Sequence, residues 1–454
     1  MRTEVPQNAF TIQTRVLKDN MGELCALLDS IGEDVKGNPH LPFTSLDRLH
    51  YASFVVIDAD PDDPYLLFEG NVDGPVRDFL DDLMARAGTG LAAIYRYCKG
   101  SPASAAPPAA LVDYLVDHDI GASAFYVAWP GHTVTTIREE QLLRERINRF
   151  LDDQGDLTSQ APADIRRRIQ ELVRADPELS GVLQPHVRPF LVRYGVALTV
   201  ALVLPVVLGL LKLVKAALSP RRGTRRFLAR KALWALGGAL GAVAGALRFH
   251  EWRDDRLVAA RQPDWQTRYN QWTHSLGHVV DREDHQLQNH LASVTSVKPG
   301  WFRITVLNMV FAVVTLSVRL VANQGKLGFI GSVHFARWVV TPDDKSVIFL
   351  SNFDGSWESY LNDFIDLAYF GLNAVWSNTD NLIGFPSTKL LAFGGAKDEQ
   401  RFKAYARYSQ FRSRVWYSAY PDLTVPNIRT NMKIRAQLFE PLDDEDTDAW
   451  LRLL

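Results

Sequence analysis

The sequence has little cysteine and almost no net charge. Two cysteines among 454 residues, Cys25 and Cys98, cannot form a disulfide framework, and neither lies near a cluster of metal-ligating residues, so no metal site is predicted. A formal net charge of −2 gives no global basic excess of the kind that nucleic-acid-binding proteins show. The chain also lacks a P-loop, a GxSxG sequence and a GxGxxG sequence after a strand, which argues against common nucleotide and hydrolase chemistries.

The most informative feature that is present is an internal repeat. Four blocks of the first half recur in the same order in the second half: 49–60 as 333–344, 66–83 as 347–364, Gly90-Leu91 as Gly371-Leu372, and 126–138 as 417–429. The first block aligns His50 with His334. The chain therefore holds two copies of one module, a first copy at about 8–150 and a second copy at about 288–440.

Each copy has the same predicted order of elements. In the first copy, 10–17 alternates like a strand and 21–35 has helical spacing, and two strands, an amphipathic helix and a last strand follow. The order β-α-β-β-α-β is typical of the ferredoxin-like fold, whose antiparallel sheet carries helices on one face. Because the other face must also be covered, we expect an α+β protein in which two tandem ferredoxin-like modules form an intrachain α+β barrel.

Between the copies the composition becomes apolar. Residues 194–211 and 232–247 contain no charge, although both are short for a spanning helix and Pro205 interrupts the first. They predict an inserted, membrane-associated helical hairpin, with a buried hairpin of a soluble protein as the alternative. Six basic residues of its loop are expected to contact anionic lipid headgroups: Arg221, Arg222, Arg225, Arg226, Arg230 and Lys231. A homo-oligomer could form through a face of three glycines: Gly237, Gly241 and Gly245.

The orientation of this hairpin can be read in two ways. A spanning hairpin with a cytoplasmic basic loop would place both copies outside, yet the first 16 residues lack the apolar core of a signal peptide. We therefore favour a monotopic hairpin with the modules on the cytoplasmic side, and the apolar segment 304–318 is also expected to touch lipid. The predicted organisation has five parts: a first module (1–150), a helical linker (151–187), the hairpin (188–252), a second helical linker (253–287), and the second module with a C-terminal tail (288–454).

The stretch SNFDGSWESYLNDF, which begins at residue 351, is dense in polar side chains. Turn chemistry explains Asn352 and Asp354, an N-cap explains Ser356, and the helix dipole favours Glu358 in the first turn. This structural interpretation leaves the density of polar residues unexplained, so the four residues are also candidate catalytic groups. The first copy keeps the aspartate as Asp73 but lacks the serine and the glutamate. A site, if present, is expected to lie mainly in the second copy.

Strand alternation in VHFARWVV places His334 and Arg337 on opposite faces of a sheet. One face meets the helices of the module and the other faces the interior between the copies, so either residue could line a cavity. His50 holds the equivalent position in the first copy, whereas Ser53 replaces the arginine. A hydrogen-bonded core histidine is the structural alternative.

Paired ferredoxin-like modules resemble the dimeric α+β barrel superfamily, which includes dye-decolourising peroxidases, chlorite dismutases and small monooxygenases. The segment GNVDG at 70–74 fits the GxxDG motif of those peroxidases, while Ser351 replaces the first glycine in the second copy. The resemblance implies haem, with its ligand among three histidines: His334, His50 and His186. It also implies that Asp354 or Asp73 manages protons and that Arg337 stabilises developing negative charge.

Two functions follow from these features. The first is a membrane-associated oxidoreductase, peroxidase- or monooxygenase-like, that acts on an apolar or lipid-derived substrate. The alternative is a non-catalytic lipid-binding or membrane scaffold protein whose barrel holds an apolar ligand or a partner. Fold alone does not separate the two, whereas the absorbance spectrum and metal content of the purified protein would.

Overall fold

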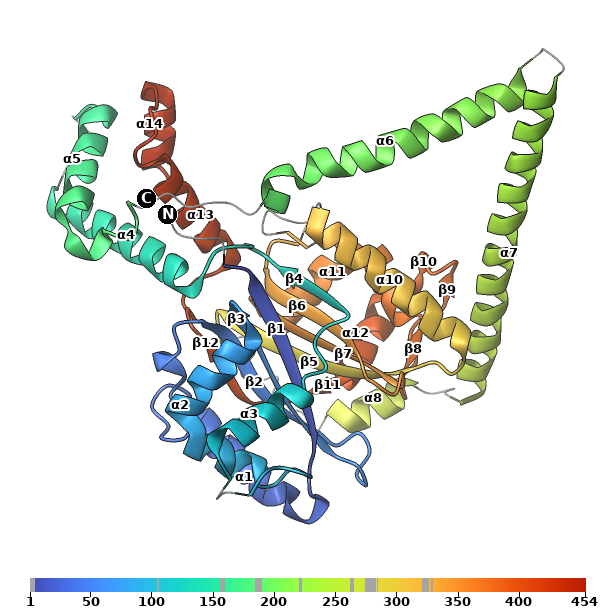
Figure 1. Cartoon of the computed structure of the whole chain (residues 1–454), viewed down its shortest axis with the longest axis horizontal. Coiled ribbons are helices and arrows are strands. Elements are labelled where there is room, and N and C mark those ends of the chain that lie inside the picture. Colours follow the sequence, from blue (N-terminus) through green and yellow to red (C-terminus); the bar gives the residue numbers. More distant parts are fainter. Residues whose placement is uncertain are drawn as a thin grey trace.

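A computed structural model describes residues 5–103, 106–155, 160–183, 190–219, 223–261, 265–273, 283, 285–320, 326–327 and 330–454. The protein has a mixed α+β fold with antiparallel sheets (Figure 1). The first copy of the repeat contains β1 (Gln7–Arg15), α1 (Met21–Glu33), β2 (Leu49–Ile57), β3 (Tyr65–Asp73), α2 (Val76–Tyr95), α3 (Pro108–Asp117), β4 (Ala124–Val127) and α4 (Val134–Asp153).

The second copy repeats the order of the first, adds short elements before its last strand and ends with an additional helix. Its main elements are β5 (Gln288–Val297), α10 (Trp301–Leu320), β6 (Val333–Val340), β7 (Ser346–Asp354), α11 (Trp357–Trp376), β12 (Ser413–Ser418) and α13 (Val425–Gln437). The additions are β8 (Thr379–Asp380), β9 (Thr388–Lys389), β10 (Phe393–Gly394), α12 (Glu399–Tyr408), β11 (Gln410–Phe411) and the C-terminal α14 (Asp444–Leu451). Between the copies lie α5 (Pro162–Ala175), α6 (Phe190–Leu218), α7 (Thr224–Arg261) and α8 (Trp265–Thr273).

The last strand of each copy pairs in the sheet of the other copy. One sheet has the order β1-β3-β2-β12, and the other has the order β11-β5-β7-β6-β4. Strand β1 pairs with β3 in the same register in which β5 pairs with β7. Before β4 begins, Asp119 forms an isolated bridge with Ile12 of β1, and β11 likewise pairs with β5 before β12 joins β2. The two copies are therefore interlocked through both connecting segments.

Each sheet buries one face against helices and the other against the opposite sheet. Phe54 of β2 belongs to an apolar cluster that includes Leu24 of α1 and Leu83 of α2. Its neighbour Val55 points the other way and belongs to a cluster that includes Ile348 of the other sheet. This alternation, with period two, explains why every residue of β2 is buried.

Helices α6 and α7 leave the body of the molecule as two long helices that meet far from the sheets (Figure 1). Helix α6 continues through Pro205, so this proline does not end the helix. The C-terminal part of α7 is attached to the second copy, where Glu251 accepts the backbone N–H groups of Leu390 (2.9 Å) and Leu391 (2.8 Å). Asp254 also pairs with the buried Arg303 at 2.5 Å.

Two helices of the described residues are long and apolar enough to cross a membrane: Thr224–Leu257 within α7 and Trp301–Val318 within α10. Core helices of soluble proteins meet the same criteria of length and composition, but they are mostly buried. Here none of the most apolar window of α7 is buried, and only 22% of that of α10. The two helices therefore present apolar side chains to the outside of the chain.

Candidate functional site

A histidine–aspartate pair lies at the same place in each copy. The Nε2 atom of His50 lies 3.0 Å from Asp73 Oδ1, and that of His334 lies 2.7 Å from Asp354 Oδ1. The second carboxylate oxygen of each aspartate accepts the first backbone N–H of the helix that follows the last strand of the same copy, at 2.9 Å for α4 and 2.7 Å for α13. Each aspartate therefore links a strand end, a histidine and a helix N-terminus.

The hydrogen bonds of His50 determine its tautomer. The hydroxyl of Tyr420 lies 2.8 Å from His50 Nδ1. Burial, reinforced by the charge of Asp73, raises the pKa of Tyr420 well above its ordinary value, so the hydroxyl stays protonated and donates to Nδ1. Nε2 then carries the ring proton and donates it to Asp73.

The predicted haem ligands can be tested against this geometry. A ligating imidazole needs a nitrogen that is free to face the iron. Both nitrogens of His50 already have partners, and His334, which is 2% exposed, points its Nε2 at Asp354. His50 therefore has no nitrogen free to face an iron, whereas the contacts described for His334 involve only its Nε2. His186, the third candidate, lies outside the described residues.

The other members of the polar stretch point in different directions. The side-chain oxygen of Asn352 accepts a hydrogen bond from Trp416 Nε1 at 2.9 Å. Ser356 caps α11 by accepting the backbone N–H three residues later at 3.2 Å, and Glu358 pairs with Lys403 at 2.8 Å on the surface. The predicted catalytic serine and glutamate thus occupy helix-end and surface positions. Their described contacts do not join them to the buried aspartate.

Arg337 crosses from the second copy to the first and is 1% exposed. Its Nη2 atom lies 2.6 Å from Glu69 Oε2 and 2.7 Å from Asn71 Oδ1. The other oxygen of Glu69 accepts a hydrogen bond from Ser53 at 2.7 Å. Burial alone would raise the pKa of Glu69, but the charge of Arg337, the nearby imidazole of His290 and the hydrogen bond from Ser53 outweigh it and lower this pKa. The carboxylate therefore stays ionised.

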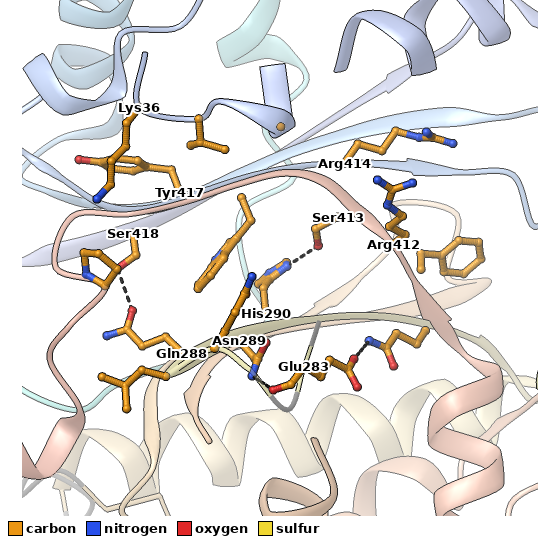
Figure 2. A pocket seen from close by; sticks show the side chains of 18 of the residues that line it. Lys36, Glu283, Gln288, Asn289, His290, Arg412, Ser413, Arg414, Tyr417 and Ser418 are labelled. Atoms are coloured by element: carbon orange, nitrogen blue, oxygen red, sulfur yellow. Dashed lines mark hydrogen bonds between the residues drawn. The ribbon is translucent and has the colours of Figure 1, made fainter. Parts of the chain in front are cut away.

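A cavity of about 450 Å³ lies between α1, β5 and β12 (Figure 2). Its lining includes Gln288, His290, Ser413, Trp416 and Ser418, with Lys36, Arg412 and Arg414 supplying positive charge. His290 Nδ1 lies 2.7 Å from Ser413 Oγ, and its Nε2 lies 3.2 Å from Glu69 Oε1. The cavity wall is thus in direct contact with the buried Glu69–Arg337 pair.

The wall of this cavity depends on close contact between α1 and β12. A Cβ atom at Gly32 of α1 would lie 2.0 Å from the backbone oxygen of Arg414, so only glycine fits there. Asp29, one turn earlier, lies 2.7 Å from the guanidinium of Arg414 and 3.5 Å from that of Arg412. Two cations and one anion leave one net positive charge on this wall.

A second, apolar cleft of about 280 Å³ lies between α10 and α11. Its lining includes Val313 and Val318 of α10, Trp338 of β6, and Ala368 and Gly371 of α11. Helix α11 is kinked at Ala368, where φ is −134° and ψ is 20°. The indole N–H of Trp338 is buried and has no hydrogen-bond partner among the described residues. The cleft can therefore hold an apolar group.

Sequence reasoning missed several of these residues. The offset that aligns the aspartates also aligns Gln7 with Gln288, and each glutamine donates to a backbone carbonyl that follows the last strand of its own copy (2.6 Å to His132, 3.1 Å to Tyr420). Extending the repeat to the starts of β1 and β5 would have found this pair. His290 has no such signal, because alanine holds its position in the first copy.

Of the predicted lipid-binding residues, Arg221 and Arg222 lie outside the described residues. The other four lie in the first two turns of α7: Arg225, Arg226, Arg230 and Lys231. A Cβ atom on any glycine of the predicted oligomer face would meet nothing within 4 Å: Gly237, Gly241 and Gly245. Among the described residues, no group of three or more His, Cys, Asp or Glu residues could hold a metal ion.

Comparison with known proteins gives no further assignment. No protein-family model matches the chain, and no curated protein or solved structure matches it. Function must therefore be argued from the residues of this chain.

Proposed function

We propose that this chain is a membrane-associated protein built on two ferredoxin-like modules, and that it binds an apolar or lipid-derived ligand. The modules would form a closed intrachain barrel. The exchange of last strands between the two sheets supports this arrangement, because each connecting segment touches both sheets. The interior of such a barrel is filled by side chains such as Val55 and Ile348.

One observation carries the membrane assignment: α7 exposes large apolar side chains along its length. Trp234 is 79% exposed, Leu240 is 63% exposed and Val243 is 58% exposed. An unpartnered apolar surface of this size is costly in water and favourable in lipid. Basic residues at the start of the helix add attraction to anionic headgroups. The modules would lie on the cytoplasmic side, with the hairpin embedded in one leaflet, and the open glycine face could support a homo-oligomer.

The apolar cleft between α10 and α11 is the proposed ligand site. Helix α10 exposes Met309 (62%) and Val313 (63%) beside this cleft, so a lipid chain could enter it from the same apolar surface. Native mass spectrometry of the protein released from detergent should then show bound lipid.

Vesicle flotation tests the membrane assignment. The full chain should float with vesicles that contain anionic lipid and should resist carbonate extraction. Leu240→Glu places a charge in the middle of the apolar helix and should weaken partitioning about tenfold or more. Leu17→Glu, at an exposed leucine of the first copy, is the matched control and should leave flotation unchanged. A wild-type chain that stays in solution without detergent would contradict the proposal.

The oxidoreductase prediction remains separate from this proposal. His50 does not favour it, since both of its nitrogens have buried partners. An absorbance spectrum of the purified protein, recorded before and after addition of haem, tests it directly. A Soret band that persists after gel filtration would support haem binding. The absence of such a band after haem addition would remove the haem version.

A further inference from the structure

Ser413 and His290 line the 450 Å³ cavity side by side (Figure 2), and the buried Glu69 lies behind the histidine. Ser413 Oγ lies 2.7 Å from His290 Nδ1, and His290 Nε2 lies 3.2 Å from Glu69 Oε1. A serine that contacts a histidine, which in turn contacts a carboxylate, is the arrangement of an activated serine nucleophile. Such sites are recognised by geometry and not by the order of residues in the chain.

The fold supplies a structural reason for this placement. Ser413 is the first residue of β12 and lies where the chain leaves β11 in one sheet and joins β2 in the other. The register shifts between Ser413 and Val415, and such irregularities often re-aim a side chain next to an active site. His290 comes from β5, whereas Glu69 comes from β3 of the opposite sheet. The three groups therefore meet where the two sheets join.

The negative charge of Glu69 suits a group that orients the proton of His290. Because Glu69 stays ionised beside Arg337, its carboxylate favours the tautomer of His290 that carries the proton on Nε2. Nδ1 is then left as an acceptor, and it faces the hydroxyl of Ser413. In this tautomer, a neutral His290 can take the proton of Ser413 as a general base.

The other half of the repeat lacks all of these groups. Ala9 holds the position of His290, Ala122 holds that of Ser413, and Leu350 holds that of Glu69. The buried histidine–aspartate pairs, in contrast, occur in both copies. The architecture of the repeat therefore does not require the Ser–His–Glu line, which needs a separate explanation.

We propose that Ser413, His290 and Glu69 form a serine-nucleophile site that hydrolyses short carboxylic esters. Ser413 Oγ would attack the ester carbonyl carbon while its proton passes to His290 Nδ1. Cleavage of the C–O bond would release the alcohol, which takes that proton, and leave an acyl group on the serine. Water would then attack the acyl carbonyl, lose its proton to the same nitrogen, and release the carboxylic acid as the proton returns to Ser413.

The cavity suits a small ester with an accessible carbonyl. Its volume of about 450 Å³ lies in the range of small-molecule sites. Arg412 and Arg414 line the same wall, and together with Asp29 they carry one net positive charge. This charge can stabilise the oxyanion that develops on the carbonyl oxygen. The site lies away from the lipid cleft, so the activity does not depend on the proposed membrane function.

The test uses the full chain in detergent, p-nitrophenyl butyrate and a fluorophosphonate probe. Wild-type protein should hydrolyse the ester and gain one probe mass, which peptide mapping places on Ser413. Ser413→Ala should abolish labelling and lower the hydrolysis rate about a hundredfold or more. His290→Gln should lower both labelling and hydrolysis by about 10²–10⁴-fold, the contribution of a general base.

The control is Ser30→Ala, an exposed serine of α1 whose hydroxyl donates to the backbone oxygen of Leu27 and which lies outside the cavity lining. It should keep at least half of the wild-type rate. Circular dichroism and thermal unfolding of each variant would separate misfolding from loss of chemistry. Equal hydrolysis by wild type and by folded Ser413→Ala, or labelling at another residue, would overturn the proposal.

Discussion

The two copies of the repeat share one set of buried polar residues and differ in another. Each copy contains a buried histidine in contact with an aspartate, and this aspartate also accepts a backbone N–H at a helix N-terminus. Only the second copy supplies Arg337 and His290, and only the first supplies Glu69. The shared set joins elements that every copy of the fold contains, whereas the second set meets beside a cavity. Features that differ between the copies are therefore the better guide to function.

The two copies also differ in how deeply the helix after their first strand is buried. Helix α1 of the first copy buries Leu24, Leu28 and Ile31 against its sheet. Helix α10 holds the same place in the second copy but exposes Trp301 (77%) and Val313 (63%). The equivalent helix is therefore buried through apolar side chains in the first copy and exposes apolar side chains in the second.

The largest expected loss of stability comes from replacing Arg337, which has no counterpart in the first copy. Arg337→Met would leave Glu69 buried without a cation, and we expect a loss of about 3–5 kcal/mol in the free energy of unfolding. Adding Glu69→Leu, the residue found at the equivalent position 350, should restore part of this loss because the unpaired charge disappears. Denaturant titration by tryptophan fluorescence in detergent measures both variants.

The same variants predict a pH dependence. The folded-state pKa of Glu69 lies below its ordinary value, so its contribution to stability is present above about pH 4.3 and is lost as the pH falls through the folded pKa. The Glu69→Leu variant should lack this part of the acid destabilisation. A double variant as unstable as Arg337→Met alone, with the acid dependence unchanged, would show that the charge of Glu69 is not the cause.

The shared set gives the next largest effect. Asp73→Ala and Asp354→Ala each remove the acceptor of a buried histidine and of a backbone N–H, so each should cost about 2–4 kcal/mol. If their roles are purely structural, the two losses should agree within about 1 kcal/mol. Glu358→Ala, at an exposed position, should change stability by less than about 0.5 kcal/mol. A functional loss at unchanged stability, seen only for Asp354→Ala, would favour the predicted catalytic role instead.

Comparison of the chain with itself located the repeat, because its matches are local and keep their order. The turn interpretation of Asn-x-Asp-Gly also follows from local chemistry, with glycine at positive φ in both copies (Gly74 and Gly355, both 80°). The exchange of last strands could not be predicted, since edge pairing between copies depends on tertiary contacts. The proposed Ser–His–Glu line could not be predicted either. Its residues, Glu69, His290 and Ser413, come from three distant segments with no local motif.

The smallest expected effect tests the helix layers through one repeated glycine. At Gly90 of α2 an added Cβ would lie 2.0 Å from the backbone oxygen of His40, whereas at Gly371 of α11 it would meet nothing within 4 Å. Gly90→Ala should therefore destabilise the protein by about 1–3 kcal/mol through overpacking. Gly371→Ala should stabilise it by about 0.5–1 kcal/mol, because alanine is the better helix former. Denaturant titration of both variants decides the matter: equal effects would mean that the two helix layers are packed alike. Opposite signs would confirm that the second copy keeps open space beside the proposed lipid cleft, where the first copy has none.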